Sequence, residues 1–87
     1  MKITICGEQW RIVTVAASAF PDDRVGDCDR DARQIRILRG LPDAERLRVV
    51  VHELLHAHAW SWPERRVDDV STQIARTLRR LGWRSRA

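Results

Sequence analysis

The sequence predicts an α+β fold, and three observations lead to this class. Short runs that alternate apolar and polar residues occupy the first half of the chain, over residues 2–15 and 33–38. Two stretches with apolar residues at helical spacing follow, over residues 43–59 and 64–81. Gly40 and Pro42 separate the two halves. Strands followed by helices predict a small antiparallel or mixed N-terminal sheet packed on two C-terminal helices.

The strand region is expected to contain two hairpins. In KITICGEQWRIVTV, two β-rich runs flank Gly7-Glu8, which is typical of a hairpin turn. RQIRIL alternates at Ile35 and Ile37, and DCDRDA before it could complete a second hairpin. The two cysteines, Cys6 and Cys28, are too few for a disulfide scaffold. We expect both to be small buried thiols in or near strands.

Two helices are expected after Gly40. Asp43 is the predicted N-cap of the first, which runs to about residue 59, and SWP then breaks the chain. Its expected shared face comprises Leu47, Val50, Val51, Leu54 and His58. The second helix is expected over residues 64–81 and is stopped by Gly82. Its predicted buried stripe comprises Val67, Val70, Ile74, Leu78 and Leu81.

Length and composition favour one folded domain over residues 1–87. The apolar and charged fractions, 44% and 32%, are typical of globular proteins. No apolar run approaches the ~18 residues of a membrane span, and the N-terminus lacks the pattern of a signal peptide. We therefore expect a cytoplasmic protein that does not insert into a membrane.

The segment HELLH, residues 52–56, is the strongest functional signal. His52 and His56 are four residues apart, so on a helix they lie ~40° apart and can bind one metal ion. Glu53 lies on the flank of that face, where it can act as a general base instead of a ligand. His58 lies ~200° around the helix from His56, so we expect it to point away from the metal.

A catalytic zinc site needs a third protein ligand, and a carboxylate from a neighbouring element is the expected source. Glu64 opens the second predicted helix, which can fold back antiparallel and bring it to the metal. Asp68, one turn further on, could hydrogen-bond a ligand histidine. Asp68 and Asp69 are the alternative ligands. In another interpretation, Ser61 and Glu64 form a capping box and Glu64 only caps the helix.

The two segments HELLH and E-x-x-V-D resemble the zinc site of gluzincin-type peptidases. The resemblance is to their smallest members, the ImmA/IrrE-like and related short phage or bacterial metallopeptidases, and it extends over GEQWRI, GDCD, RQIRIL and IARTLRRLGW. It implies a minimal zincin-like domain that hydrolyses protein or peptide substrates. Zn²⁺ would be bound by His52, His56 and Glu64, and Glu53 would be the base and proton shuttle. An edge strand would hold the substrate extended, and RQIRIL is the expected strand near the cleft.

The chain departs from larger relatives of that group, since it has no tyrosine and no downstream histidine to stabilise an oxyanion. Arg65, Arg66 and His58 are the candidate substitutes. The competing hypothesis is a non-catalytic, metal-stabilised binding module. An exchangeable fourth position on the metal would separate the two, because structural sites are closed.

The net charge of +4 is unevenly distributed, with five aspartates in residues 22–31 and no acid after Asp69. The basic end comprises Arg76, Arg79, Arg80, Arg84 and Arg86. In the binding-module hypothesis, this end would contact nucleic acid or an acidic partner. Trp83 is its single aromatic residue, which argues against a nucleic-acid site and favours a solvated helix face.

Overall fold

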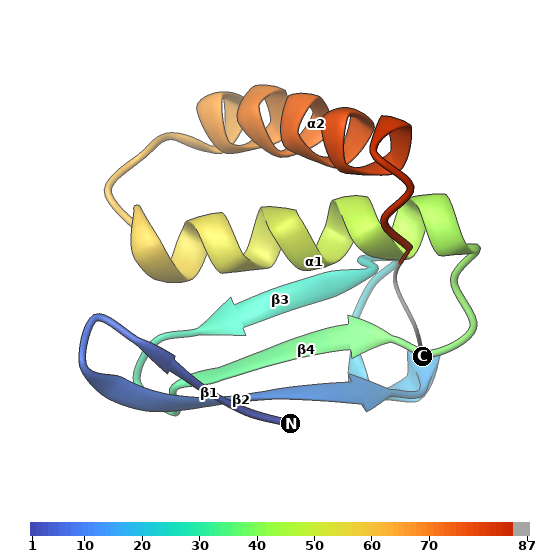
Figure 1. The fold of residues 1–87 in the computed structure, drawn as a ribbon. Coiled ribbons are helices and arrows are strands. Elements are labelled where there is room, and N and C mark those ends of the chain that lie inside the picture. The colour runs from blue at the N-terminus through green and yellow to red at the C-terminus, as the bar shows by residue number, and fades with distance from the viewer. Residues whose placement is uncertain (85–87) are drawn as a thin grey trace.

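The computed structural model describes residues 1–84 and has three layers (Figure 1). Helix α1 (Asp43–His58) crosses one face of a four-stranded sheet, and helix α2 (Glu64–Arg80) lies on the other side of α1. The strands are β1 (Lys2–Ile5), β2 (Glu8–Val15), β3 (Gly26–Asp29) and β4 (Gln34–Leu38), with a short 3-10 helix at Ala17–Ala19. The predicted α+β class is confirmed. Arg86, part of the predicted basic end, lies outside the described residues.

The sheet has the strand order β1-β2-β4-β3 and is mixed. Both predicted hairpins are present, since β1 pairs antiparallel with β2 and β3 pairs antiparallel with β4. The central pair, β2 and β4, is parallel, with Ile12 opposite Ile35. This arrangement makes β4 an internal strand and places β3 at one edge of the sheet.

The turn of the first hairpin determines where Cys6 lies. Cys6 and Gly7 have φ values of 51° and 79°, and positive φ at both central residues is typical of the tight turns that suit hairpin twist. Cys6 is exposed at this turn, so the prediction of a buried thiol there is wrong. Cys28 is half-buried in β3.

The main core lies between the sheet and α1. Ile35 and Ile37 alternate along β4 as predicted, and both are fully buried against Trp10 and Val49. Of the expected α1 face, Val50 and Leu54 pack against this core, Leu47 and Val51 are half-buried, and His58 is exposed. Because α1 is covered by the sheet on one side and by α2 on the other, its apolar residues are not confined to one stripe.

The N-cap predicted for α1 is wrong. Asp43 is the first helical residue, and Pro42 precedes it without a side-chain cap hydrogen bond. The Asp43 carboxylate instead accepts a hydrogen bond from Arg79 Nη1 at 3.4 Å, near the last turn of α2. A negative charge in the first turn still interacts favourably with the helix dipole.

The buried stripe predicted for α2 is partly wrong. Val67 is fully buried, but Ile74 and Leu81 are 38% and 71% exposed. The other buried positions are Ser71 and Ala75, so the buried residues follow a four-residue spacing. Since α2 packs on α1 and not on the sheet (Figure 1), it buries one narrow seam, and small side chains there let the helices approach closely. The predicted stop at Gly82, where φ is 93°, is confirmed.

Neither helix within residues 1–84 combines the length and the apolar character needed to cross a membrane.

Candidate metal centre

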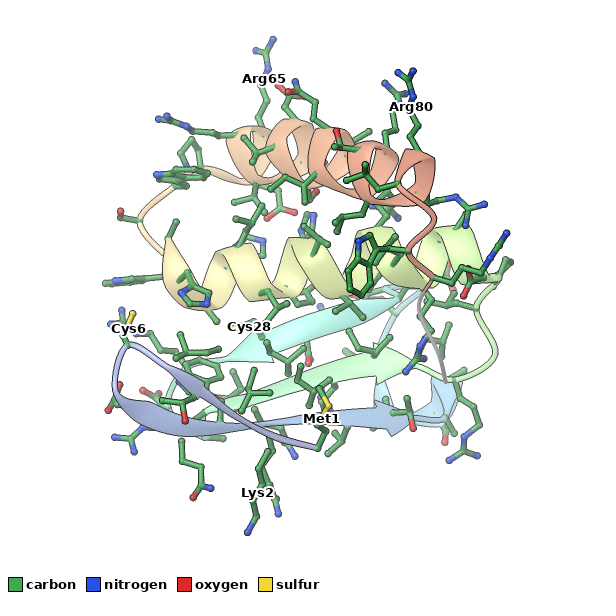
Figure 2. The ribbon with its side chains drawn as sticks, viewed as in Figure 1. Met1, Lys2, Cys6, Cys28, Arg65 and Arg80 are labelled. Atoms are coloured by element: carbon green, nitrogen blue, oxygen red, sulfur yellow. The ribbon has the colours of Figure 1, made fainter. Side chains whose placement is uncertain are left out.

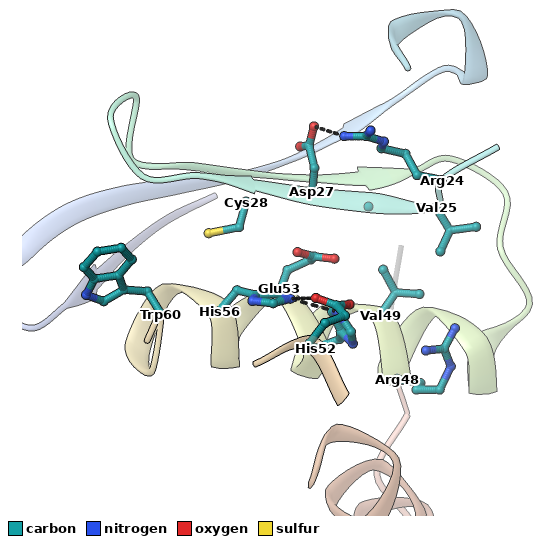
Figure 3. A pocket seen from close by; sticks show the side chains of 12 residues that line it. Arg24, Val25, Asp27, Cys28, Arg48, Val49, His52, Glu53, His56 and Trp60 are labelled. Carbon is teal, nitrogen blue, oxygen red and sulfur yellow. Dashed lines mark hydrogen bonds and ion pairs between the residues drawn. The ribbon is translucent and has the colours of Figure 1, made fainter. Parts of the chain in front are cut away.

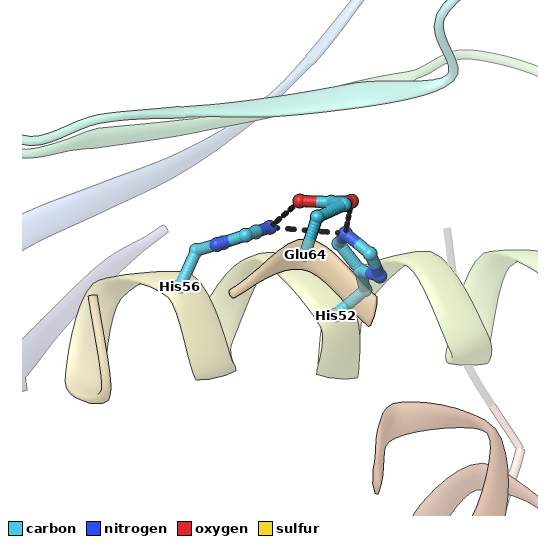
Figure 4. Close-up of side chains that lie close together, drawn as sticks. All are labelled: His52, His56 and Glu64. Carbon is cyan, nitrogen blue, oxygen red and sulfur yellow. Dashed lines mark hydrogen bonds and ion pairs between the residues drawn. The ribbon is translucent and has the colours of Figure 1, made fainter. Parts of the chain in front are cut away.

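Three side chains from the two helices meet at one point (Figure 4). His52 and His56 project from adjacent turns of α1, and Glu64 is the first residue of α2. Glu64 Oε1 lies 2.9 Å from His52 Nε2, and Glu64 Oε2 lies 2.8 Å from His56 Nε2. The two Nε2 atoms are 3.1 Å apart. The turn after α1 sends α2 back along it, which brings Glu64 over the histidines, as the sequence predicted.

The donor set and its spacing fit a metal ion. One ligand atom from each residue lies within 4.8 Å of the others. Nitrogen and oxygen ligands ~2.0–2.1 Å from a tetrahedral ion would be ~3.3 Å apart, close to the observed separations. Two imidazole lone pairs facing each other repel unless a proton or a cation lies between them. His52, His56 and Glu64 are therefore positioned to bind a metal ion.

Contacts on the far side of His52 favour the ligand tautomer. Asp68 Oδ1 lies 3.1 Å from His52 Nδ1, and Ser71 Oγ lies 3.5 Å from the same nitrogen. Ser71 donates its own proton to the Asp68 carbonyl at 3.1 Å, so it can only accept from His52. A proton held on Nδ1 leaves the Nε2 lone pair free towards Glu64 and His56, which is the usual arrangement of a metal-bound histidine.

The alternative interpretations of Glu64 do not match the geometry. Pro63 occupies the N-cap position of α2 and no side chain caps this helix, so the capping box with Ser61 is absent. Asp69 is exposed and is not part of the cluster. His58 is also exposed and outside the cluster, as its position on the helix predicts.

Glu53 is buried beside this cluster, with 6% of its surface exposed. A methyl group added at Gly26 would lie 3.2 Å from Glu53 Oε2, so the carboxylate is held against the backbone of β3. Within residues 1–84, the side chain of Glu53 forms no hydrogen bond and no ion pair. Burial raises its pKa to about 7, and the carboxylates of Glu64 and Asp27 add to this shift. A cation bound by Glu64 and the histidines would oppose the shift.

The cluster and Glu53 line a cleft of about 690 Å³ between β3 and α1 (Figure 3). The wall opposite α1 is formed by Val25 and by Gly26, Asp27 and Cys28 of β3. The expectation that RQIRIL borders the cleft is wrong, because β4 is internal and β3 is the edge strand beside the site. Burial also raises the pKa of the Cys28 thiol to about 11, with a contribution from the charge of Glu53.

The cationic groups at the cleft are not the ones the sequence suggested. Arg65 projects away from α1 (Figure 2), and the guanidinium of Arg66 stacks on Trp62 at 4.4 Å. Arg24 and Arg48 line the cleft instead. The sequence did contain a signal for Arg48, because it precedes His52 by four residues and must share its helix face.

Comparisons with family models, with curated proteins and with solved structures found no match to this chain. Functional arguments about the chain therefore rest on its motif and on the geometry of the site.

Proposed function

We propose that the protein is a zinc-dependent peptidase in which His52, His56 and Glu64 hold the metal ion and Glu53 is the general base. The observation that carries this proposal is the position of Glu53, a largely buried residue whose carboxylate has no protein partner among residues 1–84 and lines the same cleft as the ligand cluster. Burying an unpartnered carboxylate costs free energy, and a site that only held a metal would have no use for it.

The donor set favours zinc over harder ions. Two imidazoles and one carboxylate suit Zn²⁺, whereas Mg²⁺ and Ca²⁺ prefer oxygen ligands. When bound, zinc would act as a Lewis acid and lower the pKa of a coordinated water from about 15.7 towards ~7. Three protein ligands leave a fourth position for this chemistry, as in catalytic zinc sites.

The chain's own residues would then move the proton and hold the substrate. Glu53 would accept the proton of the attacking water and deliver it to the leaving amine as the peptide bond breaks. Asp68 keeps His52 in the ligand tautomer. The outer edge of β3 has no partner strand within residues 1–84, so its backbone can hydrogen-bond an extended peptide.

The test is a comparison of wild type with Glu53→Gln, which keeps the size of the side chain and removes its basicity. Zinc content by elemental analysis and the far-UV spectrum should be unchanged. Cleavage of a peptide library, followed by mass spectrometry, should fall by about 10²-fold or more. Glu45→Gln, on the same helix and outside the cleft, is the matched control and should cleave like wild type.

Two outcomes would reject the peptidase. Equal cleavage by wild type and Glu53→Gln would indicate a contaminant or another mechanism. No cleavage of any peptide, with zinc bound and its fourth position exchangeable, would favour the metal-stabilised binding module.

The third ligand can be tested separately with Glu64→Gln and Asp69→Asn. Glu64→Gln should lower zinc affinity by about tenfold or more, because a neutral amide replaces an anionic ligand. Asp69→Asn removes the same charge from an exposed position of the same helix and should leave the affinity unchanged. Loss of zinc from Asp69→Asn alone would reject Glu64 as the ligand.

A further inference from the structure

The two ends of the cleft differ in chemistry. Residues 48, 52, 56 and 60 follow one another at four-residue steps and all line the cleft. His52 and His56 occupy the middle, Trp60 lies at one end, and Arg48 lies at the other beside Val49 (Figure 3). A peptide bound along the cleft would therefore meet an aromatic ring on one side of the metal centre and a guanidinium on the other.

Arg48 differs from the other cations near the cleft because its guanidinium has no close partner among residues 1–84, although its charge acts on Glu53 from a longer distance. Arg24 is tied to Asp22 by two hydrogen bonds of 2.8 Å and also faces Asp27 at 3.9 Å. Arg30, beyond the opposite end, lies over the Trp60 ring at 4.0 Å. Within residues 1–84, Arg48 forms no ion pair and no side-chain hydrogen bond, although its side chain is half-buried and lines the cleft.

A guanidinium without a protein partner has donor groups that only water can satisfy in the free protein. Carboxylates match the planar donor fork of arginine and form charge-assisted hydrogen bonds with it.

The distance from Arg48 to His52 along the cleft indicates which peptide residue Arg48 would contact. One helical turn of ~5.4 Å separates Arg48 from His52, and an extended peptide rises ~3.3 Å per residue. A group on Arg48 would thus belong to a residue about two positions from the scissile bond.

We infer that Arg48 selects substrates through a carboxylate placed about two residues from the scissile bond. The inference rests on the proposed peptidase and specifies its substrate class. The carboxylate can come from an acidic side chain or from the C-terminus of a short peptide, and both would bind the same guanidinium. Arg48 is a specificity residue in this scheme, and its side chain does not take part in the transfer of protons.

The test uses zinc-loaded protein carrying Glu53→Gln, in which peptides bind without turnover. Fluorescently labelled libraries of short peptides with Glu, Gln or Lys at one fixed position, each with a free or an amidated C-terminus, are titrated and followed by anisotropy. We expect the glutamate or free-carboxylate library to bind most tightly. Adding Arg48→Gln should weaken that binding by about tenfold and leave the amidated glutamine library unchanged.

Arg30→Gln is the matched control, since it removes the same charge beyond the other end of the cleft, where Arg30 lies over the Trp60 ring. Comparing the glutamate and C-terminal arms identifies which source of the carboxylate is used. Equal binding of all libraries, or equal weakening by Arg30→Gln and Arg48→Gln, would overturn the inference. With Glu53 restored, a drop in kcat for every peptide without a change in preference would also overturn it, because Arg48 would then act on the reacting carbonyl.

These outcomes are separable from failure of the peptidase itself. Binding that depends on Arg48, without cleavage by the wild type, would support the carboxylate site and reject the peptidase. If cleavage is abolished by Glu53→Gln but does not depend on the charge of the peptide, only the role of Arg48 is rejected.

Discussion

At Gly26, the first residue of β3, the strand lies directly against side chains of α1. A methyl group built on Gly26 would lie 2.8 Å from Val49 Cγ1 and 3.2 Å from Glu53 Oε2. Val49 is 1% exposed and has no room to withdraw. The absence of a side chain at position 26 therefore allows the strand to hold Glu53 against its backbone.

Gly26→Ala should lower the free energy of unfolding by about 1–3 kcal/mol, the usual cost of overpacking a filled core. Urea denaturation measures this change. Val49→Ala removes the methyl that clashes, so the cost of Gly26→Ala should be smaller in that background. An equal cost in both backgrounds would show that crowding at Val49 is not the cause.

The two cysteines should differ in reactivity. Burial and neighbouring carboxylates raise the pKa of Cys28 to about 11, so below that pH it stays a thiol, which is the unreactive form. Cys6 is exposed at a turn. In metal-free protein at pH 8, alkylation of Cys28 by iodoacetamide should be about tenfold or more slower than that of Cys6, as followed by mass spectrometry.

The single variants Cys6→Ser and Cys28→Ser assign the two rates. Raising the pH towards 11 should accelerate the reaction of Cys28, because the thiolate fraction then grows. Equal rates at pH 8 would contradict the raised pKa. No disulfide is expected to interfere, since both cysteines are free.

At the residue scale, the sequence predicted what helix geometry alone determines. The approach of His52 and His56 follows from a spacing of four, and the orientation of His58 away from the cluster follows from its angle on the same helix. Its predicted place on the apolar face was wrong, because His58 is exposed. Cys6 was assigned wrongly because its exposure depends on the conformation of the hairpin turn. Arg48 was missed although its spacing of four from His52 places it on the same helix face, because only the approach of β3 makes that face one wall of a cleft. The approach of β3 to α1 is a long-range contact that leaves no local pattern in the sequence.

At the scale of elements, local signals predicted the hairpins and both helices, whereas long-range pairing was not accessible. Turn residues and alternation mark β1-β2 and β3-β4 within short segments. The parallel pair β2-β4 brings together strands separated by the whole of β3, and no nearby residue encodes it. For the same reason the strand beside the cleft was assigned to β4 when it is β3.

The seam between the helices was also mispredicted for a physical reason. Hydrophobicity singled out Ile74 and Leu81, but close packing of α2 on α1 selects the smaller residues Ser71 and Ala75. Val67 is the one large apolar residue fully buried on α2. It therefore contributes strongly to docking this helix, and hence to holding Glu64 over the histidines.

Val67→Ala should lower the free energy of unfolding by about 2 kcal/mol, through lost burial and the cavity left behind. Val70→Ala makes the same chemical change at a half-buried position of the same helix and should cost clearly less. Chemical denaturation of both variants gives the comparison. If Val70→Ala were the more damaging, α2 would pack on α1 through a different face.

At the scale of the whole molecule, the candidate metal centre lies at one end of the contact between α1 and α2, whose packed part is the narrow seam of Val67, Ser71 and Ala75. Helix α2 packs on α1 without support from the sheet (Figure 1), and a domain of this size has only a small core. The Glu64 side chain is 66% exposed, and among residues 1–84 its carboxylate pairs only with the two histidines. A metal ion bound there would therefore cross-link the helices, and binding would be coupled to folding.

Removing the metal should consequently destabilise the protein. A ligand present at 100 times its Kd stabilises the folded state by about 2.7 kcal/mol, and each kcal/mol shifts Tm by about 4–8 °C for a domain of this size. Treatment of zinc-loaded protein with EDTA should therefore lower Tm by about 10 °C or more in differential scanning calorimetry. Zinc should restore the original Tm, whereas Mg²⁺, which prefers oxygen ligands, should not.

The double variant His52→Ala, His56→Ala provides the control, because it lacks both nitrogen ligands. Its Tm should already lie below that of the loaded wild type and should not respond to EDTA or to added zinc. If the chelator lowered Tm equally in the double variant, the stabilising ion would bind elsewhere in the chain. A wild-type Tm that is indifferent to zinc, although zinc is bound, would show instead that α2 docks on α1 through Val67 and its neighbours alone.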